Sequence, residues 1–213
     1  MFTSRSIQSN LTLRDKIFSI DYILVFSILT LGIISMFAMY STDGGSFAYH
    51  TKSHILRFFV FFSLFLLISF FPIKFWFQSS LAIYFIFFIL LLGVKYFGLT
   101  SSGSQRWINL YVINLQPSEL MKIGLILFLA KYYHRIPVSD VNRFKFLFFP
   151  LICVSAPALL VMSQPDLGTA ILIVAGGIIV AFLAGIKFKF FAYISIIFLA
   201  LAPIAISFLK PYQ

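Results

Sequence analysis

Seven long apolar runs, separated by short polar segments, limit what this chain of 213 residues can fold into. The hydrocarbon core of a bilayer is about 30 Å thick, so a helix needs about 20 residues to cross it. The runs have about this length, and they predict an all-α fold: a polytopic helical bundle in a membrane. The predicted spans are Asp21–Tyr40, Ile55–Phe71, Trp76–Phe97, Ser118–Tyr133, Phe146–Met162, Leu167–Ile186 and Phe190–Phe208.

The composition excludes an ordinary soluble domain. Hydrophobic residues make up 61% of the chain and charged residues only 10%, whereas soluble domains have about half and about a quarter. The formal net charge is +10, but the basic residues are scattered between the apolar runs, so we expect no nucleic-acid partner. Cys153 lies inside an apolar run, where we expect it to pack, and a single cysteine forms no internal disulfide.

The basic residues predict the orientation in the membrane, because cytoplasmic loops carry an excess of lysine and arginine. With seven spans, the connecting segments alternate between the two sides of the membrane. Ten basic residues then lie on one side and five on the other, and Lys122 lies inside a span. Residues 1–20 are therefore predicted to be a cytoplasmic N-terminal segment, residues 21–213 form the membrane domain, and seven spans place the C-terminus outside. The larger set is Arg5, Arg14, Lys16, Lys74, Lys131, Arg135, Arg143, Lys145, Lys187 and Lys189; the smaller set is Lys52, Arg57, Lys95, Arg106 and Lys210.

Two predicted spans open with similar motifs, Gln116–Leu120 and Gln164–Gly168, in which an acid follows a proline. One interpretation is helix initiation, because proline suits the first helical turn and an acid there meets the positive end of the helix dipole. The other interpretation starts from the energetic cost of a charge near a membrane. Such a charge is tolerated mainly where it is paired or hydrated. Both helices begin on the predicted outer side, so Glu119 and Asp166 also indicate a polar pocket that opens outward.

Three further side chains fit such a pocket. Lys122 follows Glu119 by three residues and can pair with it on one helix face, in either a structural or a functional ion pair. Arg106 and Trp107 place a cation beside an indole, which suits a phosphate and a sugar, although a tryptophan there also suits a membrane-interface anchor. We therefore expect Arg106, Trp107, Glu119, Lys122 and Asp166 to line one outward cavity, and we expect no metal ligands.

The sequences Arg106–Asn109, Gln116–Leu120 with Lys122, and Gln164–Ala170 resemble the motifs of the SEDS family of shape, elongation, division and sporulation proteins. The resemblance covers essentially the whole chain. It implies a peptidoglycan glycosyltransferase of the bacterial inner membrane that polymerises lipid II for cell-wall elongation and rod shape. It also implies a class B penicillin-binding protein as the transpeptidase partner, and substrate binding by the five residues of the expected cavity.

The resemblance further implies that the catalytic residue lies elsewhere. Family members have a key aspartate in a large outer loop after the seventh span, which would fall beyond Gln213. We therefore expect this chain to be a fragment or a truncated product that does not polymerise alone. No defined cofactor is implied, although a divalent metal could assist the leaving pyrophosphate, as could the cations of Arg106 and Lys122.

Two other function classes stay open from the residues alone. An outward cavity with charges inside the membrane would also suit a transporter or flippase of the lipid-linked precursor. A non-catalytic scaffold of the elongation complex is the third class. An aspartate in a long outer loop downstream, followed by three more spans, would favour the enzyme.

Overall fold

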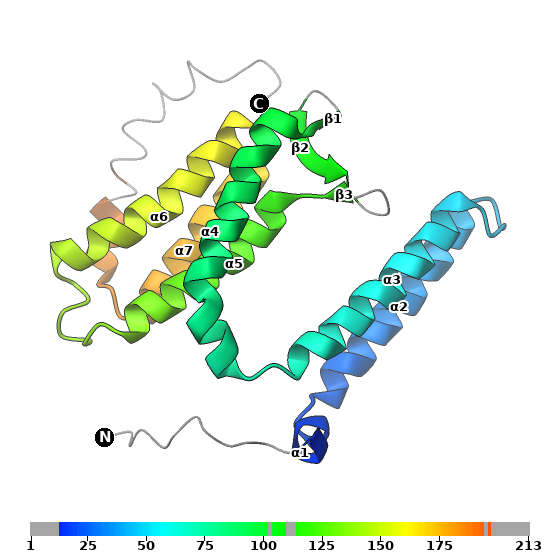
Figure 1. The fold of residues 1–213 in the computed structure, drawn as a ribbon, viewed down its shortest axis with the longest axis horizontal. Helices are drawn as coiled ribbons and strands as arrows, with labels where there is room; N and C mark the ends of the chain where they lie inside the picture. Colours follow the sequence, from blue (N-terminus) through cyan, green and yellow to red (C-terminus); the bar gives the residue numbers. More distant parts are fainter. Residues whose placement is uncertain (1–12, 102–103, 110–113, 194–195, 197–213) are drawn as a thin grey trace. The chain divides into compact units, whose positions relative to one another are not determined.

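The computed structural model describes residues 13–101, 104–109, 114–193 and 196 of the chain (Figure 1). The described residues are mainly helical, as the apolar runs predict, and they fall into two compact units, Met1–Phe75 and Trp76–Gln213. The prediction of a cytoplasmic segment over residues 1–20 lies partly outside the described residues and stays a prediction.

The first unit contains the short helix α1 (Leu13–Phe18) and two long helices, α2 (Tyr22–Thr42) and α3 (Tyr49–Ser69). The helices α2 and α3 pack against each other, and Gly32 allows this because a β-carbon there would overlap the ring of Phe58. The hydroxyl of Ser35 also lies 2.9 Å from Nε2 of His54 across the pair. Most of the remaining surface of both helices is apolar and exposed, as expected for helices that face lipid.

The turn between α2 and α3 is built from Asp43, Gly44 and Gly45. Both glycines have positive φ, 71° and 78°, which L side chains rarely adopt. The Asp43 carboxylate accepts hydrogen bonds from the backbone N–H of Thr51 at 2.8 Å and from its hydroxyl at 2.6 Å. These bonds lower the pKa of Asp43, the hydroxyl bond most. Asp43 therefore supplies an acceptor to the first turn of α3, whose own preceding residue, Ala48, has no side chain that can cap it.

In the described part of the second unit, four long helices accompany a small sheet. The helices are α4, which starts just before the unit boundary, α5, α6 and α7, and they lie side by side in Figure 1. Buried apolar side chains from all four helices form the core, including Leu91, Leu125, Val161 and Ile173. The bounds are Ile73–Phe97 for α4, Pro117–His134 for α5, Phe144–Ser163 for α6 and Leu167–Leu183 for α7.

Two polar contacts connect α4 to α6 and to Gln164, the residue that follows α6. The Tyr84 hydroxyl donates to the carbonyl oxygen of Cys153 at 2.9 Å, and the Gln164 amide donates to the carbonyl oxygen of Leu91 at 3.2 Å. Cys153 is free and buried, so the packing role predicted for it is confirmed. Gln164 is only 5% exposed, and its bond avoids the cost of burying an unpaired amide.

A three-stranded antiparallel sheet connects α4 to α5. Its strands are β1 (Leu99–Ser101), β2 (Ser104–Asn109) and β3 (Asn114–Leu115), in the order β1-β2-β3. No element was predicted between the spans Trp76–Phe97 and Ser118–Tyr133, so the sheet is an addition to the predicted all-α fold. It gives the residues before α5 a defined register, with Trp107 opposite Leu99 and Ile108 opposite Leu115.

The helices confirm the predicted membrane architecture. Among the described residues, α2, α3, α4 and α6 are long and apolar enough to cross a membrane, and α7 is a shorter apolar helix of 17 residues. The helix α5 coincides with the fourth predicted span, but it carries three charged residues, Glu119, Lys122 and Lys131. Residues 188–193 are helical, but most of the seventh predicted span lies outside the described residues. Seven spans and the orientation stay predictions, whereas a polytopic helical membrane fold is what the structure has.

Candidate functional site

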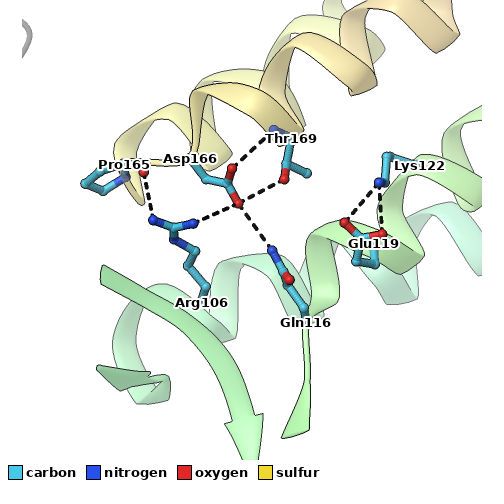
Figure 2. A network of polar contacts seen from close by, with 7 residues as sticks. All are labelled: Arg106, Gln116, Glu119, Lys122, Pro165, Asp166 and Thr169. Carbon is cyan, nitrogen blue, oxygen red and sulfur yellow. Dashed lines mark hydrogen bonds and ion pairs between the residues drawn. The ribbon is translucent and has the colours of Figure 1, made fainter. Parts of the chain in front are cut away.

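The strand β2 and the start of α5, which are close in the chain, meet the start of α7, which follows α5 and α6 (Figure 2). Local sequence explains two of them. Pro117 occupies the first turn of α5, and the side chain of Asp166 caps α7 by accepting from the backbone N–H of Thr169 at 3.1 Å. The interpretation of Asp166 as a helix-initiating residue is therefore confirmed.

The Asp166 carboxylate is also the centre of a wider network. Its Oδ2 atom accepts from the Thr169 hydroxyl at 2.9 Å and from the Gln116 amide at 3.2 Å. The same oxygen lies 3.5 Å from Nη1 of Arg106. The Asp166 side chain is 11% exposed, so these partners replace most of the water that a charged carboxylate would otherwise bind.

Arg106 reaches this network from β2. Besides the ion pair, its Nη2 atom donates to the carbonyl oxygen of Pro165 at 3.0 Å. The guanidinium thus holds both the side chain that caps α7 and the backbone just before it. The Nε atom of Arg106 is buried without a hydrogen-bond partner in the described part of the chain, while the side chain as a whole stays 31% exposed.

Gln116 connects this network to α5. Its amide contacts Asp166, and its carbonyl oxygen accepts from the backbone N–H of Glu119 in the first turn of α5, at 3.1 Å. Glu119 is therefore one turn, or about 4.5 Å of helix rise, beyond the residue that contacts Asp166. Lys122 Nζ lies 2.9 Å from each carboxylate oxygen of Glu119, which confirms the predicted pair.

Trp107 follows Arg106 on β2 and is partly buried. The pairing of β2 with β1 is irregular at this point, because Trp107 lies opposite Leu99 and Gln105 opposite Thr100, which leaves Arg106 as the extra residue of a β-bulge. The structure thus brings Arg106 and Asp166 into contact, pairs Glu119 with Lys122, and connects the two pairs through Gln116. That all five predicted residues line one cavity stays a prediction.

The sequence analysis did not assign a role to Gln116 or Thr169, although both lie in the quoted motifs. Thr169 had a usable signal, because the third residue after a capping aspartate is the one whose backbone N–H the cap accepts. Gln116 had none, since its partner Asp166 is 50 residues away.

The site offers cations rather than a set of metal ligands. Within the described ranges, no group of three His, Cys, Asp or Glu side chains could hold a metal ion. The one carboxylate at the centre is already bound by Arg106, Gln116 and Thr169. In this part of the chain, the guanidinium of Arg106 and the ammonium of Lys122 are cationic donors that can meet an anionic group.

Comparisons with known proteins agree with these features. The chain is 32% identical over 174 residues to "Probable peptidoglycan glycosyltransferase FtsW" of Buchnera aphidicola subsp. Schizaphis graminum, covering 79% of this chain and 49% of that protein. It is 38% identical over 129 residues to "Peptidoglycan glycosyltransferase MrdB" of Escherichia coli K12, covering 60% of this chain and 34% of that protein. The chain thus spans half or less of the length of these relatives.

Two solved structures share the fold. An aspartate-to-alanine variant of the rod shape determining protein RodA of Thermus thermophilus matches with a TM-score of 0.72 and 25% identity, over 87% of this chain and 60% of that chain. A chain from a study titled "Structural coordination of polymerization and crosslinking by a peptidoglycan synthase complex" matches with a TM-score of 0.71 and 26% identity, over 90% of this chain and 55% of that chain.

A family model described as "Cell cycle protein", that of FtsW, RodA and SpoVE, matches residues 15–213. The match includes every described helix except the first residues of α1, together with the strand and helix starts that form the network around Asp166. It is the family that the sequence motifs predicted under the name SEDS. The chain therefore belongs to the FtsW/RodA/SpoVE family of cell cycle proteins.

Proposed function

We propose that this chain is part of a peptidoglycan glycosyltransferase of the bacterial inner membrane, which polymerises lipid II for cell-wall elongation. The names of the curated relatives support the activity, and the likeness to RodA supports the link with rod shape. The chain spans half or less of those relatives, so the proposal concerns the whole protein to which these residues belong. The likeness to a chain from a peptidoglycan synthase complex supports a class B penicillin-binding protein as partner.

The observation that carries the proposal is the network that Arg106 and Asp166 form between β2, α5 and α7. In the proposed reaction, the 4-hydroxyl of the acceptor sugar attacks the anomeric carbon of the glycan and displaces its lipid pyrophosphate. The leaving group gains negative charge, so fixed cations near it lower the barrier. Arg106 and Lys122 would meet the pyrophosphate, and Asp166 would hold the Arg106 guanidinium in place.

The remaining roles in the reaction are assigned by resemblance. The Trp107 indole would stack on a sugar or a lipid chain. A base that accepts the proton of the hydroxyl is required, and the resemblance assigns this role to the key aspartate in a large outer loop of the family. A protein that includes this loop is called the extended protein below.

The test uses the extended protein, purified with its transpeptidase partner and supplied with lipid II. Glycan strands are measured by gel electrophoresis. Arg106→Gln should lower the rate by about 10²- to 10³-fold if the guanidinium stabilises the leaving group. The matched control is Lys187→Gln, because Lys187 follows the C-terminal end of α7, whereas the site lies at the start of this helix. Wild-type rates in the folded Arg106→Gln variant would contradict the proposed role.

The same preparation separates the other function classes. Reconstituted in vesicles, a flippase would move lipid II across the bilayer without forming glycan. A scaffold would do neither, yet would still bind the transpeptidase. Either result with the extended protein would replace the glycosyltransferase proposal.

A further inference from the structure

Two cations at the C-terminal end of α5 lie over one aromatic ring of α4. Lys131 and Arg135 are four residues apart and lie on the same side of the chain. The Lys131 Nζ atom is 5.5 Å, and the Arg135 Cζ atom 5.9 Å, from the ring centroid of Phe77 on α4. The His134 ring packs edge-on against the same phenyl ring at 5.3 Å. Three basic side chains thus surround Phe77, which we call the Phe77 cluster.

The described protein offers this cluster no carboxylate. The acids of the second unit pair with other cations: Asp166 with Arg106, Glu119 with Lys122 and Asp140 with Arg143. Lys131 donates to the carbonyl oxygen of Gln78 at 2.9 Å and keeps two further N–H donors. The partial negative charge at the C-terminus of α5 favours cations there. The helix dipole does not, however, provide hydrogen-bond acceptors for the N–H groups of these cations that point away from the helix.

Apolar side chains continue from the cluster along α4. Leu81 and Phe85 follow Phe77 at intervals of four residues, on the same helix face, and are 47% and 52% exposed. The helix α4 is long and apolar enough to cross a membrane. Cations at the level of Phe77, followed by an exposed apolar stripe on a membrane helix, match a charged head joined to an acyl chain. A soluble phosphate would use only the first of these two features.

We propose that the Phe77 cluster binds the phosphate headgroup of an anionic phospholipid, with an acyl chain along Leu81 and Phe85. Lys131 and Arg135 donate to the phosphate oxygens, and cation–π contacts with Phe77 hold both side chains in place. Basic sites between membrane helices commonly select anionic headgroups in this way. The site is separate from the network around Asp166, and the proposal does not depend on the glycosyltransferase activity.

The test measures lipid binding to the purified 213-residue chain in neutral detergent by native mass spectrometry. The probes are phosphatidylglycerol and phosphatidylcholine with identical acyl chains, and inorganic phosphate as competitor. Each cation removed should weaken binding of phosphatidylglycerol about fivefold, so the double variant Lys131→Gln/Arg135→Gln should lose about 25-fold. The matched control is Lys187→Gln/Lys189→Gln, which also removes two positive charges but leaves Phe77 and its partners intact.

The outcomes separate a site from diffuse charge. The proposal holds if phosphatidylglycerol binds at least tenfold more tightly than phosphatidylcholine and the Lys131/Arg135 variant loses at least five times more affinity than the control. Equal losses in the two variants, or no preference between the lipids, would overturn it. Complete displacement by millimolar inorganic phosphate would reassign the cluster to a soluble anion. If thermal melting shows that the double variant is unfolded, Arg135→Gln alone must show the fivefold loss.

Discussion

Replacing Asp166 by asparagine and by alanine should separate its two roles. The carboxylate caps α7 through the Thr169 backbone N–H, and it faces the Arg106 guanidinium at 3.5 Å. Asparagine caps a helix about as well as aspartate, so Asp166→Asn should remove mainly the charge. Asp166→Ala removes the charge, the cap and the bonds from the Thr169 hydroxyl and the Gln116 amide.

The magnitudes follow from these contacts. Leaving a fully buried charge without its partner costs about 3–5 kcal/mol, but Arg106 is 31% exposed, so we expect about 1–2 kcal/mol for Asp166→Asn. The cap contributes about 1 kcal/mol, and the bonds from the Thr169 hydroxyl and the Gln116 amide contribute about 1 kcal/mol each. Asp166→Ala should therefore cost about 4–5 kcal/mol in the free energy of unfolding.

The assay is denaturant unfolding in detergent micelles, arranged as a double-mutant cycle with Arg106→Met. We expect Asp166→Asn and Arg106→Met to be coupled by about 1–2 kcal/mol, because either substitution alone already breaks the ion pair. The control is the pair Arg143–Asp140, another arginine–aspartate contact at 3.3 Å, but between residues on one turn of the chain and with an arginine that is 63% exposed. Its cycle should give a coupling of less than about 0.5 kcal/mol.

Two results would refute this reasoning. Additivity of Asp166→Asn and Arg106→Met within about 0.3 kcal/mol would show that the pair contributes nothing to stability. Equal costs for the asparagine and alanine variants of Asp166 would show that the cap on α7 is energetically unimportant.

Three further predictions concern other parts of the chain. Glu119 and Lys122 form an exposed pair three residues apart, so their cycle should give about 0.3–1 kcal/mol of coupling in the extended protein, and no coupling would reject the pair. The pKa of Asp43 is lowered in the folded protein, so its bonds to α3 should be complete above the ordinary aspartate pKa of about 3.9 and be lost as the pH falls through the lower folded value. Protection of the amides at the start of α3, measured as their exchange rate relative to the intrinsic rate at each pH, should therefore fall in acid in the wild type, and Asp43→Asn should remove that dependence. Reporter fusions should place Arg143 in the cytoplasm and Ser46 outside; the reverse placement would contradict the predicted orientation.

The helices could be predicted because each depends on a local pattern. Apolar runs gave α2, α4, α6 and α7 to within a few residues. The start of α3 was placed six residues too late, because its first turns, from Tyr49 to His54, are polar and an apolar window excludes them. A helix needs backbone hydrogen bonds in those turns but no apolar side chains.

The sheet and the centre of the site depend on contacts between distant residues. The strands β1 and β3 have three and two residues, too few for an alternating pattern to show. The pairing of Glu119 with Lys122 followed from their spacing on one helix, whereas the contact of Arg106 with Asp166 joins residues far apart in sequence. Counting spans placed those two residues on one side of the membrane, but it contained no information on their distance.

The two interpretations of Asp166, helix initiation and a functional pocket, turn out to be compatible. The same carboxylate caps α7 and holds Arg106, so loss of activity in an Asp166 variant would not by itself reveal a substrate ligand. Arg106 is the better residue for that question, because it caps no helix and still exposes 31% of its side chain. Arg106→Lys keeps the positive charge but cannot contact Asp166 and the Pro165 carbonyl with one planar group. If Arg106→Lys keeps the activity but loses stability, the positive charge of Arg106 serves the anionic substrate, and the planar contacts of its guanidinium serve the fold.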